Sequence, residues 1–171
     1  MCCVCPAAAT AAAAAAAAAA TDADGVHVGQ SDLPASLVRQ MLGPQKILGI
    51  SVKTPEQAAK AQADGADYIG VGAVFPTGTK SASVIGLEGL REVCELSGLP
   101  VVAIGGVGAG NAREVLGVGA DGLAVVSAVF AAPDVEVATR ELWMAVTQAQ
   151  QQRQQDEATA AEGAVAVAVG Q

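Results

Sequence analysis

The sequence predicts an α/β protein that forms part of a (β/α)8 barrel, with about five of the eight strand–helix units in its 171 residues. Short apolar runs alternate with segments of helical period, and glycine or polar turns join the two. The runs begin 22, 21, 32 and 22 residues apart. Such a repetition of strand and helix with short connections is typical of a parallel sheet.

Five apolar runs are the expected strands. They are mostly continuous rather than alternating in polarity, which is the pattern of strands buried on both faces of a parallel sheet. Because aromatic residues make up only 2% of the chain, a core built from these runs must be aliphatic. In chain order the runs cover residues 25–29, 47–51, 68–72, 100–105 and 122–127.

The clearest helix signals lie between the second and third runs. Thr54 is a typical N-cap residue, Pro55 stands at the first helical position, and Gln57 at the third completes a capping box. Gly65 is the expected stop. These signals predict a helix between Thr54 and Gly65.

Two further helices are predicted from similar signals. The first starts at Leu33, has Pro34 near its start and ends before Gly43. The last starts at Pro133 and presents one packing face at helical spacing. That face consists of Val135, Ala138, Leu142, Ala145 and Ala149.

The composition divides the chain into three zones. Residues 1–21 are a low-complexity poly-Ala segment, which we expect to be disordered or a frayed helix. Residues 22–149 are the patterned, globular part. Residues 150–171 carry no turn chemistry, and we expect a disordered tail there.

The charge balance argues against several classes of function. Nine Lys and Arg against seventeen Asp and Glu give a net charge of −8 with no basic run, which disfavours nucleic-acid binding and attachment to an anionic membrane. Residues 1–20 are too weakly apolar for a membrane span and lack the basic residue of a secretory signal. We therefore expect a soluble intracellular protein, and this N-terminus does not decide between plastid and cytoplasm.

Polar residues and glycines follow nearly every expected strand at its C-terminal end. They occupy positions 30–32, 51, 77–80, 105–106 and 127. A site assembled from many consecutive strands is typical of the mouth of a barrel, whereas an open doubly wound sheet concentrates its site at one switch point. The distribution therefore favours a barrel.

Two of these strand ends predict an anion site. The segment 77–80 supplies two hydroxyls and an ammonium, which suit an anion and equally suit a plain surface turn. Gly105 and Gly106 expose backbone amides before a helix, as in a barrel phosphate site, and Ser127 would complete that cup. Glycines used only for tight turns are the alternative.

Asp32, His27 and Lys53 are further candidates. Asp32 suits either a hard cation such as Mg²⁺ or the cap of the helix that begins at Leu33. His27 lies inside the first run, where we expect a hydrogen-bonded core residue rather than a catalyst. Lys53 faces either a ligand or solvent.

These strands and turns resemble thiamine-phosphate synthases. The residues concerned are DGVHVGQSD, ILGISVKTPEQA, DGADYIGVGAVFPTGTK, LPVVAIGGV and DGLAVVSAVF, in this order over about residues 22–149. The Ser-x-Lys-Thr-Pro-Glu-Gln run is most similar to the synthase domain of plant and algal bifunctional proteins, in which that domain is fused to a hydroxymethylpyrimidine-phosphate kinase.

The resemblance implies a Mg²⁺-dependent transferase of thiamine biosynthesis with a (β/α)8 barrel. The family joins hydroxymethylpyrimidine diphosphate to a thiazole phosphate, making thiamine phosphate and releasing pyrophosphate. The diphosphate departs first, and the thiazole nitrogen then attacks the pyrimidine cation that remains. The implied partners are these small phosphorylated molecules, with no nucleic acid and no membrane.

The resemblance also assigns roles to residues by their position in the motifs. Asp32 would be a Mg²⁺ ligand, and Ser51 and Lys80 would hold the diphosphate of the pyrimidine substrate. A metal ion and an ammonium suit the charge that develops on a leaving diphosphate. The thiazole phosphate would be bound at Thr77, Thr79, Gly106, Val126 and Ser127.

The sequence departs from the family pattern in its first part. An arginine, a lysine and an Asn–Asp pair that the family's first three strands supply have no counterpart, and poly-Ala stands in their place. We therefore expect the thiazole-phosphate half of the site and part of the diphosphate half. The chain is then either truncated or completed by self-association or by a missing N-terminal half. Activity of the chain alone does not follow from the resemblance. The alternatives are a thiazole tautomerase-like isomerase, which lacks support because Lys53 stands where that family has a histidine, and a non-catalytic phosphate-binding remnant.

Overall fold

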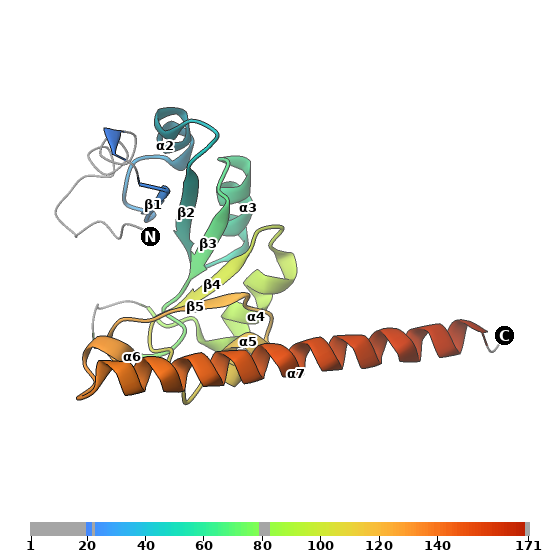
Figure 1. Cartoon of the computed structure of the whole chain (residues 1–171). Coiled ribbons are helices and arrows are strands. Elements are labelled where there is room, and N and C mark those ends of the chain that lie inside the picture. Colours follow the sequence, from blue (N-terminus) through green and yellow to red (C-terminus); the bar gives the residue numbers. More distant parts are fainter. Residues whose placement is uncertain (1–19, 22, 79–82, 170–171) are drawn as a thin grey trace.

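A five-stranded parallel sheet forms the centre of the fold in the computed structural model, which describes residues 20–21, 23–78 and 83–169. The strands are neighbours in sequence order, as in a (β/α)8 barrel, without the reversal of order that marks a doubly wound sheet. The predicted α/β class with about five strand–helix units is confirmed. The strands are β1 (Gly25–Val28), β2 (Ile47–Val52), β3 (Tyr68–Val71), β4 (Val101–Ile104) and β5 (Gly122–Ala124) (Figure 1).

Helices connect successive strands and lie along one side of the sheet (Figure 1). A short helix and a long one follow the last strand, and the long one packs against α5 and α6. The helices are α2 (Ala35–Leu42), α3 (Pro55–Ala63), α4 (Gly86–Leu96), α5 (Ala112–Gly117), α6 (Ser127–Phe130) and α7 (Val135–Val169). Within the described ranges, none of them combines the length and apolar character that a membrane span requires.

The hydrophobic core lies between the sheet and the helices. In β2, Leu48, Ile50 and Val52 point into this core, whereas Ile47 on the opposite face is 47% exposed. The expectation that the strands are buried on both faces is therefore wrong. The face away from the helices is here called the open face. It carries many glycines, such as Gly49, among its apolar residues, and the runs therefore look continuous in sequence.

The predicted capping of α3 is largely confirmed. The Thr54 side chain accepts a hydrogen bond from the backbone N–H of Gln57 at 3.4 Å, and Pro55 is the first helical residue. The Gln57 side chain accepts from the backbone N–H of Lys53 at 2.8 Å, one residue before the cap, so the reciprocal bond of a capping box is displaced. Gly65 follows the helix with φ +86°.

The helix at residues 35–42 starts two residues later than predicted. Pro34 occupies its N-cap position without a side-chain hydrogen bond, and Gly43, with φ +73°, ends the helix as expected. Asp32 does not cap this helix. Its carboxylate instead accepts a hydrogen bond from the backbone N–H of Gly29 at 2.7 Å and closes the turn between strand and helix.

The predicted last helix is longer than the sequence pattern indicated. Asp134 caps it through a hydrogen bond from the N–H of Val137 at 3.0 Å, and the helix continues to Val169. The tail expected over residues 150–171 is therefore corrected to helix as far as the structure describes it. The reason is composition, because Ala and Gln dominate this segment and both favour helix. Of the poly-Ala segment, residues 1–19 lie outside the described residues.

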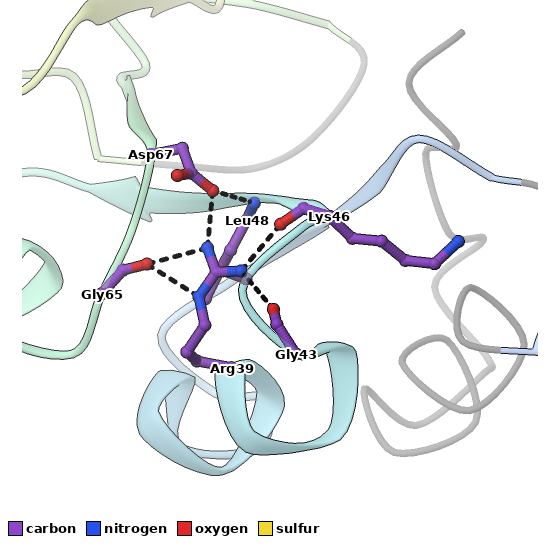
Figure 2. Close-up of polar contacts among 6 residues, drawn as sticks. All are labelled: Arg39, Gly43, Lys46, Leu48, Gly65 and Asp67. Carbon is purple, nitrogen blue, oxygen red and sulfur yellow. Dashed lines mark hydrogen bonds and ion pairs between the residues drawn. The ribbon is translucent and has the colours of Figure 1, made fainter.

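A single arginine on α2 joins three segments at the N-terminal edge of the sheet (Figure 2). Arg39 donates hydrogen bonds to the backbone carbonyls of Gly43, Lys46 and Gly65 at 2.7–3.0 Å. It also contacts the carboxylate of Asp67, just before β3, at 2.5 Å. This cluster fixes the starts of β2 and β3 and so the register between them.

Candidate functional site

A pocket of about 400 Å³ lies at the C-terminal edge of the sheet. Its lining comes from the ends of four consecutive strands and the loops that follow them, as the sequence predicted for a barrel mouth. The lining residues are Ser51, Lys53, Gly72, Ala73, Thr77, Ile104, Gly105, Gly106, Val107, Ala124, Val125, Val126 and Ser127.

Glycine lets the loops after β3 and β4 approach each other on one side of this pocket. A Cβ atom on Gly72 would lie 1.9 Å from the carbonyl oxygen of Ile104. Gly106 has φ +68°, and a Cβ there would lie 2.6 Å from the Cβ of Phe75. The backbone N–H of Phe75 donates to the carbonyl of Gly105 at 3.0 Å, so the two loops are also hydrogen-bonded. Residues with side chains cannot replace these glycines without moving the pocket wall.

Asn111 holds the glycine loop in shape. Its side-chain oxygen accepts a hydrogen bond from the N–H of Gly108 at 2.9 Å, and its amide group donates to the carbonyl of Gly106 at 3.0 Å. Asn111 also stands at the N-cap position of α5. The sequence reasoning missed this residue, although an Asn that closes a glycine-rich loop before a helix is a usable signal.

Ser51 enters the pocket as part of a hydrogen-bonded group on the open face. Its hydroxyl lies 2.8 Å from Nε2 of His27, and Nδ1 of that imidazole lies 2.9 Å from the hydroxyl of Tyr68. Burial lowers the pKa of His27, while the carboxylate of Asp32 acts in the opposite direction. The prediction of a hydrogen-bonded histidine is confirmed, but the ring belongs to the open face and not to the core beneath the helices.

Lys53 supplies a positive charge to the pocket. Its ammonium donates a hydrogen bond to the hydroxyl of Ser83 at 2.8 Å. Lys53 is exposed to solvent and also contributes to the pocket lining. An ammonium at the edge of a glycine-lined pocket favours an anionic ligand in a protein of net charge −8.

Five of the residues that the sequence assigned to phosphate groups lie together in this pocket: Ser51, Thr77, Gly106, Val126 and Ser127. Two others, Thr79 and Lys80, lie outside the described residues. Val126 is 52% exposed, and Ser127 begins the short helix α6. The described part of the expected site is thus assembled from β2 and from the loops after β3, β4 and β5.

Asp32, the expected metal ligand, does not line this pocket. It lies in a separate hollow of about 210 Å³ formed largely by the loop after β1 and by residues of α3, including Lys60 and Asp64. Among the described residues, no group of three or more His, Cys, Asp or Glu side chains could hold a metal ion. A single carboxylate fits Mg²⁺ only together with oxygens of a bound phosphate compound, which is a common donor set for this ion.

Comparison with protein families and curated sequences gives consistent similarities. The family model described as thiamine monophosphate synthase matches residues 8–129. The chloroplastic thiamine biosynthetic bifunctional enzyme TH1 of Arabidopsis thaliana is 65% identical over 113 residues, which is 64% of this chain and 22% of that protein. The thiamine-phosphate synthase of Moorella thermoacetica is 52% identical over 130 residues, which is 75% of this chain and 62% of that protein.

A solved structure agrees with these similarities. The thiamine phosphate pyrophosphorylase of Pyrococcus furiosus superposes with a TM-score of 0.73 at 50% identity, covering 79% of this chain and 65% of that one. The chain therefore spans between about a fifth and two thirds of the length of these relatives.

Proposed function

The chain belongs to the thiamine monophosphate synthase family, and from this premise we propose that its pocket binds the phosphorylated substrates of thiamine phosphate synthesis. The reaction would join hydroxymethylpyrimidine diphosphate to a thiazole phosphate and release pyrophosphate. One observation carries the proposal: a glycine-lined pocket at the ends of four parallel strands gathers hydroxyls, backbone amides and an ammonium. Such groups bind phosphate oxygens.

The proposed reaction has two bond changes. The bond between the pyrimidine methylene carbon and the diphosphate oxygen breaks first, and the electron pair leaves with the diphosphate. The thiazole nitrogen then attacks the methylene carbon of the resulting cation. The protein's task is to stabilise negative charge on the leaving group and to hold the thiazole phosphate still.

The roles of the residues follow from this division. We assign Ser51 and Lys80 to the diphosphate, and Asp32 would contribute a carboxylate oxygen to a Mg²⁺ ion. When bound, Mg²⁺ would supply Lewis-acid stabilisation of the leaving group. The groups assigned to the thiazole phosphate are Thr77, Thr79, Gly106, Val126 and Ser127.

The test is a turnover assay on the purified chain. It contains both phosphorylated substrates and Mg²⁺, and thiamine phosphate is detected by mass spectrometry. We expect product, and we expect Lys80→Ala to abolish it while Arg140→Ala leaves it unchanged, because Arg140 pairs with Glu136 on the exposed side of α7 away from the pocket. Thiazole phosphate that binds without turnover would favour the non-catalytic alternative. A folded chain that neither turns over nor binds would overturn the proposal.

A further inference from the structure

Three side chains on the open face form a continuous hydrogen-bonded chain across β1, β2 and β3. Register explains their meeting, because His27 pairs with Gly49 and Gly49 with Tyr68, which places these three residues in one row across the sheet. Ser51 follows Gly49 by two residues on the same face of β2. The imidazole bridges the two neighbours, at 2.9 Å from the Tyr68 hydroxyl and 2.8 Å from that of Ser51.

Glycines beneath the rings provide the space for this chain. A Cβ on Gly49 would lie 2.2 Å from Cζ of Tyr68 and 2.4 Å from Nδ1 of His27. A Cβ on Gly70 would lie 3.0 Å from Cε1 of the same imidazole. The two rings thus lie over a backbone surface without side chains, with centroids 5.4 Å apart, and any larger residue at Gly49 would displace them.

The backbone of Ser51 is held independently. The side-chain amide of Gln30 donates a hydrogen bond to the Ser51 carbonyl oxygen at 2.7 Å. Because β2 is paired with β1 and β3 and the Ser51 carbonyl is hydrogen-bonded, the backbone of Ser51 is fixed. The orientation of the Ser51 hydroxyl then depends on its contact with Nε2 of His27. That hydroxyl carries one proton, which it can donate either to the imidazole or to a ligand in the pocket.

The tautomer of His27 decides between these two directions. A neutral imidazole, which burial favours by lowering its pKa, has one donor and one acceptor nitrogen. If the proton is on Nδ1, Nε2 must accept the Ser51 proton, and the serine then presents only lone pairs to an anion. If the proton is on Nε2, it is donated to Ser51 Oγ, and the serine proton is available to the pocket.

We propose that Tyr68 donates its phenolic proton to Nδ1 and thereby selects the Nε2–H tautomer of His27, which turns the Ser51 hydroxyl into a donor for an anionic group. His27 and Tyr68 are positioning residues, because they act through Ser51. The inference rests on the proposed function in that it takes the ligand at Ser51 to be a phosphate or diphosphate.

The tautomer is measured directly by nitrogen NMR. His27 is the single histidine of the chain, so protein labelled with ¹⁵N-histidine and free of a histidine tag gives two assignable ring-nitrogen signals. At pH 8 we expect a protonated Nε2 and an unprotonated Nδ1. In Tyr68→Phe, which keeps the ring and removes the donor, this preference should weaken or reverse. A protonated Nδ1 in the unsubstituted protein would overturn the inference.

Binding of inorganic pyrophosphate in the presence of Mg²⁺ tests the consequence for the ligand. We expect Tyr68→Phe and Ser51→Ala each to raise its dissociation constant about tenfold, the worth of one hydrogen bond to a charged group. The double variant should bind no more weakly than Ser51→Ala, because both changes remove one contact. Thr147→Val removes a hydroxyl that donates to a carbonyl within α7, and this control should bind normally.

The outcomes separate the two proposals. If Tyr68→Phe is folded and binds pyrophosphate as tightly as the unsubstituted protein, the positioning role is wrong while the proposed function stands. Fully additive effects of the two substitutions would have the same meaning. If the unsubstituted protein binds no pyrophosphate, the proposed function fails, and so does the claim that Ser51 binds an anionic ligand. The nitrogen NMR spectrum still decides which tautomer His27 adopts.

Discussion

The guanidinium of Arg39 and the carboxylate of Asp67 meet at 2.5 Å at the N-terminal edge of the sheet, opposite the edge that carries the pocket. The same carboxylate accepts a hydrogen bond from the N–H of Leu48 at 2.7 Å, and the N–H of Asp67 donates to the Leu48 carbonyl at 2.8 Å. Asp67 thus joins the beginnings of β2 and β3 and also forms an ion pair with Arg39 of α2.

The arrangement is repeated further along the chain. Residues 119–121 have the sequence Gly-Ala-Asp, like residues 65–67. Asp121 accepts from the N–H of Val101 and donates its own N–H to the Val101 carbonyl, both at 2.8 Å. Arg153 of α7 lies 4.0 Å from the carboxylate and donates to the carbonyl of Ala120 at 3.2 Å. The extension of α7 past residue 149 therefore places Arg153 in the role that Arg39 has near Asp67.

Removal of the Arg39 side chain should destabilise the fold. We expect Arg39→Ala to lower the free energy of unfolding by about 2–3 kcal/mol, because three carbonyls and a carboxylate lose a charged donor. Arg140→Ala is the matched control. Its exposed pair with Glu136 on α7 should contribute less than about 0.5 kcal/mol. Urea denaturation measures both, and equal effects of the two substitutions would contradict the cluster's role.

A methyl group at Gly49 should disrupt the open face. The Cβ of Gly49→Ala would overlap Tyr68 and His27, so we expect a loss of about 1–3 kcal/mol in the free energy of unfolding and displacement of both rings. At Gly110 a Cβ would meet nothing within 4 Å, and Gly110→Ala should stay within about 0.5 kcal/mol. Denaturant titration compares the two variants. A Gly49→Ala protein as stable as Gly110→Ala would show that the rings are not closely packed on this glycine.

The stability contributed by His27 should depend on pH. Because its pKa is lowered in the folded protein, the unfolded chain binds the proton more readily, starting near the ordinary value of about 6.5. The contribution is therefore complete above that pH and is lost as the pH falls toward the folded pKa. We expect the stability difference between the unsubstituted protein and His27→Gln to shrink between pH 8 and pH 5, as followed by urea denaturation. A difference that grows on acidification would show that the folded protein favours the imidazolium.

Cys94 should be a slow nucleophile while the protein is folded. Burial, with a smaller contribution from the charge of Asp121, raises the pKa of its thiol to about 11. Since the thiolate is the reactive form, alkylation by iodoacetamide at pH 8 should be about 100-fold slower in the folded protein than in urea. Peptide mapping by mass spectrometry isolates Cys94 from the other cysteines. Equal rates in the two states would mean that the thiol is neither buried nor shifted.

Much of the fold could be predicted because its signals are local. Each strand of the sheet was expected within a few residues of its observed bounds, and the start of α3 at Thr54 and Pro55 was read from three adjacent side-chain types. The position of the pocket was also predictable. In a parallel sheet with short connections all C-terminal strand ends lie at one edge, so polar residues that follow those ends gather there.

The two-sided burial and the disordered tail were predicted wrongly for identifiable reasons. Glycines such as Gly49 and Gly70 made the strands look uniformly apolar, although their role is to leave room for rings from neighbouring strands. The segment after residue 149 lacks an apolar periodicity of its own, yet α7 extends through it, and Arg153 is anchored there by a carbonyl before β5.

The sequence by itself determined the class of fold, the order of the strands, the edge on which the pocket lies and the family to which the chain belongs. Only the tertiary structure decided that Tyr68, His27 and Ser51 form one hydrogen-bonded chain, and that Arg39 and Asp67 meet across 28 residues. The physical reason is that caps, turns and periodicity act within a few residues. Contacts between distant side chains depend on strand register, where a slip of one residue would send each side chain to the opposite face of the sheet.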